Sequence, residues 1–80
     1  MGISGMMSIN AIHRDGNSYW YCSGMLHRDD GPAVIYTDGT RCWYRNGLRH
    51  RDDGPAVVRM DGTSSWYQNG VIYVPRTVKI

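Results

Sequence analysis

The chain has 80 residues, of which 20% are charged, and its net charge at pH 7 is +2. A chain of this length forms one small domain with a thin hydrophobic core, and so weak a charge argues against a dedicated binder of nucleic acid or anionic lipid. Nearly all the cations are arginines, since Lys79 is the single lysine, and arginine is enriched at protein interfaces.

Residues 1–14 precede the first regular pattern and are interpreted as an imperfect lead-in. The segment from Met1 to Met6 lacks the basic stretch and the long apolar run of a signal peptide. No stretch of the chain has the apolar length of a membrane span. We therefore expect one domain over residues 1–80 that is cytoplasmic and does not enter a membrane.

Two dipeptides recur every 23 residues along the chain. Trp-Tyr occurs at 20–21, 43–44 and 66–67, and Asp-Gly at 15–16, 38–39 and 61–62. A fixed period of this length indicates stacked units, each of which buries its apolar side only against its neighbours. In this register the chain contains repeats at 15–37 and 38–60 and a truncated repeat at 61–80. Such an architecture predicts binding rather than catalysis.

The composition favours strands over helices, because ten glycines, six tyrosines and three tryptophans outweigh the few strong helix formers. Between the extended runs 40–45 and 48–51 lies Asn46-Gly47, whose residues tolerate the positive φ angles of a two-residue type I′ hairpin turn. The Asp-Gly pairs predict turns of the same kind. We therefore expect an all-β fold, an antiparallel β-hairpin meander that forms a single curved sheet.

Counting pairs outward from two-residue turns gives a predicted register. Trp43 falls opposite Val34 on one side and opposite His50 on the other, and Trp66 likewise faces Val57 and Tyr73. In this register the indoles stack along one face and form the core. The predicted core comprises Trp20, Trp43, Trp66, Val34, Val57, Leu48 and Val71. The opposite face also carries apolar residues, so some apolar surface stays uncovered.

The motif Trp-Tyr-x-Asn-Gly occurs at 43–47 and 66–70, with Ser23-Gly24 replacing Asn-Gly in the first copy. On this motif the unit resembles the MORN class of β-hairpin repeats. The added segment His-Arg-Asp-Asp-Gly-Pro-Ala-Val, at 27–34 and 50–57, is similar to units of small phage and giant-virus proteins. The chain departs from the common MORN pattern in lacking the Gly-x-Gly that ends most units. Over roughly residues 15–73, the resemblance implies a scaffold or adaptor surface rather than a reaction.

The repeated His-Arg-Asp-Asp segment has three interpretations. A kinase catalytic loop is excluded because the chain has no nucleotide-binding glycine loop and no Asp-Phe-Gly. A metal site would need several converging ligands, whereas side chains along a strand alternate in direction. A structural role remains the best reading, in which His lies against Trp and Arg pairs with an Asp of its own or the next copy.

The two cysteines give no sign of a repeated function. Cys22 and Cys42 occupy different positions within the repeat, whereas a repeated disulfide or metal clip would recur in phase. We interpret both as reduced and incidental. We therefore expect no catalytic residues, no metal site and no cofactor.

The positions at which the copies differ are the candidate binding residues. Arginines 41, 45 and 49 occur in the middle copy alone. Strand alternation places Arg41, Trp43 and Arg45 on one side, with Arg59 expected near Ser64 on that side and Tyr36 opposite Arg41. Arginine and tyrosine around a Trp are typical of an interaction hot spot, although a solvated rim would explain the same residues. The predicted partner-binding residues are Arg41, Arg45, Arg59, Tyr36, Trp43 and Arg49.

These observations predict a non-enzymatic protein-interaction module. The resemblance implies a small phage or mobile-element protein that binds and inhibits a host defence complex, as an anti-CRISPR protein does. The partner would then be a host protein or complex in the cytoplasm, and a homodimer through a sheet face or edge is a further possibility. One alternative is a repeat module that binds nucleic acid or anionic lipid, against which the weak charge argues. Another is a structural self-assembling protein.

Overall fold

Short strands and tight turns give the chain an all-β fold. The computed structural model describes residues 8–75, which contain ten β-strands and no helix. The strands are β1 (Ile9–Ile12), β2 (Ser18–Cys22), β3 (Met25–Leu26), β4 (Val34–Ile35), β5 (Arg41–Cys42), β6 (Tyr44–Arg45), β7 (Leu48–Arg49), β8 (Val57–Val58), β9 (Ser64–Gln68) and β10 (Val71–Tyr73). Within this described part, therefore, no helix is long and apolar enough to cross a membrane.

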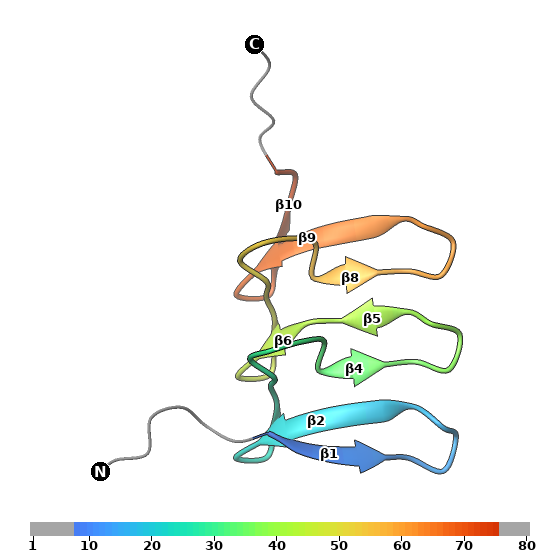
Figure 1. Cartoon of the computed structure of the whole chain (residues 1–80). Coiled ribbons are helices and arrows are strands. Elements are labelled where there is room, and N and C mark those ends of the chain that lie inside the picture. The colour runs from blue at the N-terminus through green and yellow to red at the C-terminus, as the bar shows by residue number, and fades with distance from the viewer. Residues whose placement is uncertain (1–7, 76–80) are drawn as a thin grey trace.

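Neighbouring strands are antiparallel and lie in layers, with β1 and β10 at opposite ends of the stack (Figure 1). The main sheet has the order β1-β2-β4-β5-β8-β9-β10, with β3 paired to β2, while β6 and β7 form a separate two-stranded sheet. The molecule is correspondingly thin, with extents of 45 × 36 × 18 Å.

The prediction of a single sheet is wrong. The extended segment 41–45 is interrupted at Trp43, which separates β5 in the main sheet from β6 in the second sheet. The Trp43 N–H donates to the carbonyl of Ala56 at 2.7 Å, and its carbonyl accepts from the N–H of His50 at 3.1 Å. The two sheets remain linked through the N–H of Gly47, which donates to the carbonyl of Leu26 at 2.8 Å.

The turn at Asn46-Gly47 has the predicted two-residue type I′ form. Both residues have positive φ, 52° at Asn46 and 82° at Gly47, and Arg45 pairs with Leu48 directly across the turn. Ser23-Gly24 and Asn69-Gly70 have the same pattern of positive φ angles. The pairings predicted from the Asn-Gly turns are confirmed, since Tyr73 pairs with Trp66 across Asn69-Gly70 and His50 bonds to Trp43 across Asn46-Gly47.

The turns at the Asp-Gly pairs differ from the prediction. The N–H of Tyr36 donates to the carbonyl of Thr40 at 2.9 Å, so three residues form the loop, and φ is positive at Gly39 (96°) but not at Asp38. The Asp38 carboxylate accepts the N–H of Thr40 at 2.8 Å, which closes a local turn of the kind that aspartate favours. This geometry is that of the three-residue hairpin loop with glycine in the left-handed position.

One additional loop residue changes the predicted register. Val34 pairs with Cys42 rather than with Trp43, and Val57 pairs with Ser65 rather than with Trp66. Because side chains alternate along a strand, a register shift of one residue moves every side chain of that strand to the other face of the sheet.

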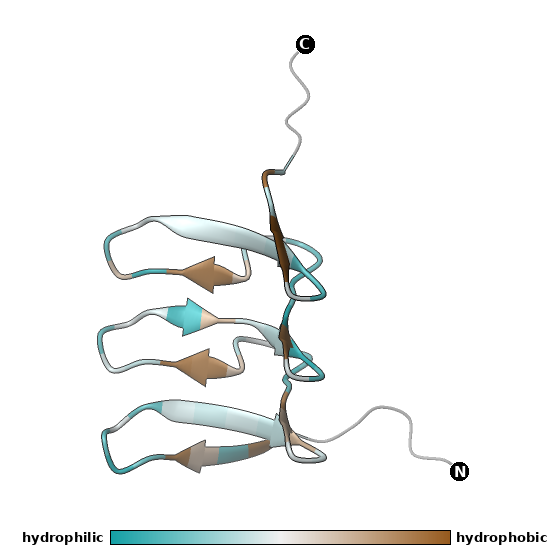
Figure 2. Cartoon of the chain, turned by 180° about the vertical axis from the view of Figure 1, so that it is seen from behind, coloured by the Kyte–Doolittle hydropathy of each residue, from teal (hydrophilic) through white to brown (hydrophobic). Residues whose placement is uncertain are grey.

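The core is a narrow layer of small side chains. Val34, Cys42 and Val57 pack together with exposures of 1%, 2% and 4%, and Ala33 and Ala56 are completely buried. The strands β4 and β8, which carry the two valines, are brown and hydrophobic, and the paler strands β2 and β9 lie beside them (Figure 2). The partly buried residues Tyr19, Leu26, Tyr36, Tyr44 and Tyr67 pack against this core.

The predicted core of stacked indoles is wrong. All three tryptophans are only partly buried. Within residues 8–75 no two tryptophan rings are in contact with each other. Leu48 and Val71, predicted in the core, are 48% and 67% exposed. The loop length explains the error, because it places Cys42 beside Val34. Cys42 is thus a core residue and not an incidental one.

Candidate functional site

The histidines of the repeated segments connect one copy of the sequence unit to the next. His27 is buried, its Nδ1 accepts the N–H of Asn46 at 2.9 Å, and its Nε2 lies 2.8 Å from the Asp29 carboxylate. A backbone N–H can only donate, so Nδ1 carries no proton and Nε2–H donates to the aspartate. His50 makes the equivalent bonds with Asn69 and Asp52, at 3.0 and 2.8 Å. These rings hold the turn of the following copy in place.

The arginines of the same segments stack on tryptophan. The guanidinium of Arg28 lies 3.9 Å from the ring centroid of Trp20, and that of Arg51 lies 3.8 Å from Trp43. Arg51 also donates to the carboxylate of Asp53 at 3.2 Å and to the carbonyl of Pro55 at 3.0 Å. The expected pairing of each arginine with an aspartate of its own copy is confirmed. These groups are used within the molecule rather than offered to a ligand.

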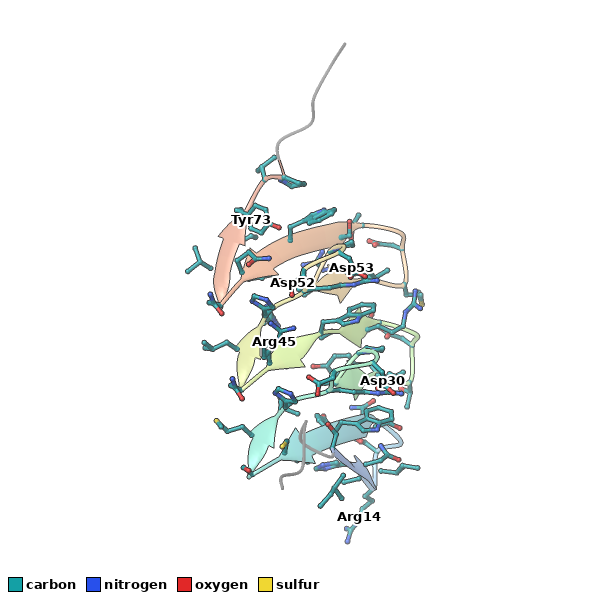
Figure 3. All side chains as sticks on the ribbon, turned by 60° about the vertical axis from the view of Figure 1, so that its left-hand side comes forward. Arg14, Asp30, Arg45, Asp52, Asp53 and Tyr73 are labelled. Carbon is teal, nitrogen blue, oxygen red and sulfur yellow. The ribbon has the colours of Figure 1, made fainter. Side chains whose placement is uncertain are left out.

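A hollow of about 560 Å³ lies between the two repeated segments, on the side that carries Trp43 and Arg45. Arg45 is already paired there, because its Nη2 lies 3.3 Å from the Asp52 carboxylate. Asp30 and Asp53 occupy equivalent places in successive layers of the stack (Figure 3), and their side chains are 86% and 87% exposed. Within residues 8–75 no cluster of three His, Cys, Asp or Glu side chains could hold a metal ion.

The Asp52 carboxylate predicts a pH dependence of stability. The hydrogen bond from His50, assisted by the charge of Arg45, lowers the pKa of Asp52 from its ordinary value of 3.8. The folded-state pKa thus lies below the unfolded one, so the stabilisation is complete above the unfolded pKa and is lost as the pH falls through the folded pKa. The Asp52→Asn variant should show a flatter dependence below about pH 4, where wild type loses stability. Urea denaturation at a series of pH values measures this, and parallel profiles for the two proteins would contradict it.

A second hollow, of about 380 Å³, lies on the face to which Cys42 points. Its main lining residues are Tyr36, Cys42, Arg49, Val57, Arg59 and Met60. Burial raises the pKa of the Cys42 thiol and that of the Tyr36 phenol. Both groups are therefore neutral near pH 7, and a buried neutral thiol is a poor nucleophile.

Arg49 is held in a fixed position beside this hollow by two tyrosines. Its Nε donates to the hydroxyl of Tyr44 at 3.2 Å, and its Nη1 donates to the hydroxyl of Tyr67 at 3.3 Å. The guanidinium carbon lies 5.9 and 5.3 Å from the centroids of these two rings, within cation–π range. The hydrogen bond to Tyr44 is the main cause that raises the pKa of Arg49. No carboxylate in the described part of the chain lies within ion-pair distance of Arg49.

The six predicted partner-binding residues do not form one site. Tyr36, Arg49 and Arg59 gather at the hollow beside Cys42, whereas Trp43 and Arg45 line the hollow between the repeated segments. Arg41 is exposed and pairs with Ile35 and Val58.

Two of the predicted neighbour relations are wrong. Tyr36 was expected opposite Arg41 but bonds to Thr40. Arg59 was expected near Ser64 but donates to the hydroxyl of Ser65 at 3.0 Å. Both errors have the same cause, since the three-residue loops shift each of these residues to the face that Cys42 occupies.

Sequence reasoning missed four residues that build the site, namely Cys42, Met60, Tyr44 and Tyr67. Cys42 and Met60 carried a usable signal, because both differ from their equivalents in the other copies. The two tyrosines carried none, because every copy has a tyrosine at that position.

Comparison of the chain with protein-family models, with curated proteins and with solved structures finds no match.

Proposed function

We propose that the protein is a non-enzymatic interaction module, built of stacked MORN-like units of 23 residues, that binds a protein partner through the face around Cys42 and Arg49. The observation that carries the proposal is that positions identical in the copies and positions that differ between them have different roles. Positions that are identical in the copies bond to one another inside the molecule, as the histidines at 27 and 50 and the arginines at 28 and 51 do.

Several positions that differ between the copies meet at the hollow beside Cys42. Arg49 stands where the other copies have Leu26 and Ile72, and Arg59 stands where the preceding copy has Tyr36. A side chain that breaks the repeat is not required by the repeating unit itself, so it can serve recognition. Arginine and tyrosine around an apolar floor form the composition that protein hot spots favour.

A protein partner is favoured over nucleic acid by the charges at this face. Arg49 and Arg59 share the hollow with Asp38 and Asp61, so no continuous basic surface of the kind that follows a phosphate backbone is present there. The resemblance to phage and giant-virus units makes a host defence complex the first partner class to test.

The test uses substitutions that copy a sister unit and therefore preserve the fold. Arg49→Leu introduces the residue of the first copy, and because it removes the hydrogen bonds to Tyr44 and Tyr67 its free energy of unfolding should fall by about 1 kcal/mol, which leaves the variant folded. We expect this variant to lose at least roughly tenfold in affinity for a partner captured from nuclease-treated lysate of the cells in which the protein acts. Binding is measured by pull-down and then by calorimetry with the purified partner.

Arg41→Ser is the matched control, since both Ser18 and Ser64 occupy the equivalent position. It removes one arginine from the other face and should leave partner binding unchanged. Loss of binding in Arg41→Ser but not in Arg49→Leu would move the site to the face of Trp43. A lysate that yields no specific partner, or one that yields only nucleic acid before nuclease treatment, would contradict the proposal.

A further inference from the structure

Arg49 differs from the other partly buried arginines of the described chain in having no anionic partner. Arg28 and Arg51 lie 3.0 and 3.2 Å from aspartates, whereas the contacts of Arg49 are with two neutral phenols. The two phenol hydroxyls accept hydrogen bonds from the guanidinium, but they do not neutralise its charge. The positive charge therefore remains available to an anion, and this indicates the chemistry of the ligand.

The guanidinium is also positioned before any ligand arrives. The hydroxyls of Tyr44 and Tyr67 engage Nε and Nη1, while Nη2 makes no hydrogen bond to any residue in 8–75. A planar group fixed at two of its nitrogens loses little further entropy when it binds. Its remaining donors suit a carboxylate, which accepts two parallel N–H bonds.

The hollow beside Arg49 has an apolar floor. Cys42 and Val57, exposed by only 2% and 4%, form its base, and Met60, which is 69% exposed, lies at its rim. A volume of about 380 Å³ accommodates one or two side chains of a partner. The site therefore combines a fixed cation with a small apolar surface.

The other charged groups at the hollow are occupied locally. Asp38 and Asp61 lie on exposed turns and accept the N–H groups of Thr40 and Thr63, at 2.8 and 3.0 Å. Arg59 donates to Ser65. Arg49 is the charged residue at the hollow that is partly buried, whereas Asp38, Arg59 and Asp61 are exposed.

We infer that Arg49 binds the carboxylate of an aspartate or glutamate side chain of the partner protein, while an apolar residue next to it in the partner's sequence packs on Cys42 and Val57. This inference rests on the proposed function and specifies the chemistry of the partner at that same face. Tyr44 and Tyr67 are positioning residues, because they act through the guanidinium that they hold.

The test is an NMR titration with two blocked peptides, acetyl-Leu-Glu-Leu-amide and its glutamine counterpart. We expect the glutamate peptide to shift the amide signals of Cys42 and Val57 and the Nε signal of Arg49 saturably, and to bind roughly tenfold more tightly than the glutamine peptide. The Arg49→Leu variant should bind both peptides equally weakly, whereas the Arg41→Ser control should behave as wild type.

Double replacement of Tyr44 and Tyr67 by phenylalanine separates positioning from charge. It keeps both rings and the arginine but removes the two hydroxyls, so the preference for the glutamate peptide should fall severalfold without disappearing. Equal binding of the two peptides to wild type, or an unchanged preference in Arg49→Leu, would overturn the carboxylate inference. The proposed function would survive that result if a purified protein partner still required Arg49, and it would fail separately if no partner did.

Discussion

Replacement of His50 by alanine should lower the free energy of unfolding by about 2 kcal/mol, within a range of 1 to 3. His50 is 8% exposed, and its Nδ1 accepts the N–H of Asn69 while its Nε2 bonds to Asp52. The substitution removes both bonds and leaves a gap beneath the turn of the last copy. Urea denaturation followed by tryptophan fluorescence measures the change, and amide hydrogen exchange at Asn69 should accelerate.

Tyr73 supplies the matched control for this prediction. It occupies the position equivalent to His50 in the last copy, and its ring packs edge-on against Trp66 with centroids 6.2 Å apart. No following turn is available there within the described residues to bond to an imidazole. Tyr73→His should therefore not gain the stability that the histidine gives at position 50. A His50→Ala variant as stable as wild type, with unchanged exchange at Asn69, would show that the histidine does not hold the copies together.

The turn residues explain how far the fold could be predicted from the sequence. Asn46-Gly47 indicated a two-residue turn, and the pairings counted from it are correct. Asp38-Gly39 looked equivalent in sequence, but the aspartate carboxylate accepts the N–H of Thr40 and favours a longer loop. A difference of one loop residue then changed which side chains fill the core. The all-β class and the 23-residue interval could thus be predicted from the sequence, whereas the strand register depended on a side-chain hydrogen bond in the Asp-Gly loops.

The candidate site was predictable only in part for a related reason. The rule that function lies where copies differ selected Arg49, Arg59 and Tyr36, which do meet at one hollow. It also selected Arg45, which is paired with Asp52 on the other face. Differences between copies reveal which side chains the fold does not need at every level of the stack, but only the geometry reveals which of them already have a partner.

The second large stability prediction concerns the stacking of arginine on tryptophan. Trp43→Ala should lower the free energy of unfolding by about 3 kcal/mol, since a large aromatic side chain is removed from a partly buried position. Part of this loss should come from Arg51, whose guanidinium lies 3.8 Å from the Trp43 ring centroid. Gly54 leaves room for that guanidinium, because a Cβ there would lie 2.9 Å from the Arg51 Cζ.

A double-mutant cycle with Trp43→Ala and Arg51→Leu isolates the stacking contribution, and we expect a coupling free energy of about 1 kcal/mol. Trp66 gives the comparison, because the position equivalent to Arg51 in the last copy is Val74, which is 89% exposed. A cycle between Trp66→Ala and Val74→Ala should therefore show no coupling. Equal coupling in the two cycles would mean that Arg51 contributes through its hydrogen bonds to Asp53 and Pro55 rather than through Trp43, and that the indoles are held by the sheet without the arginines.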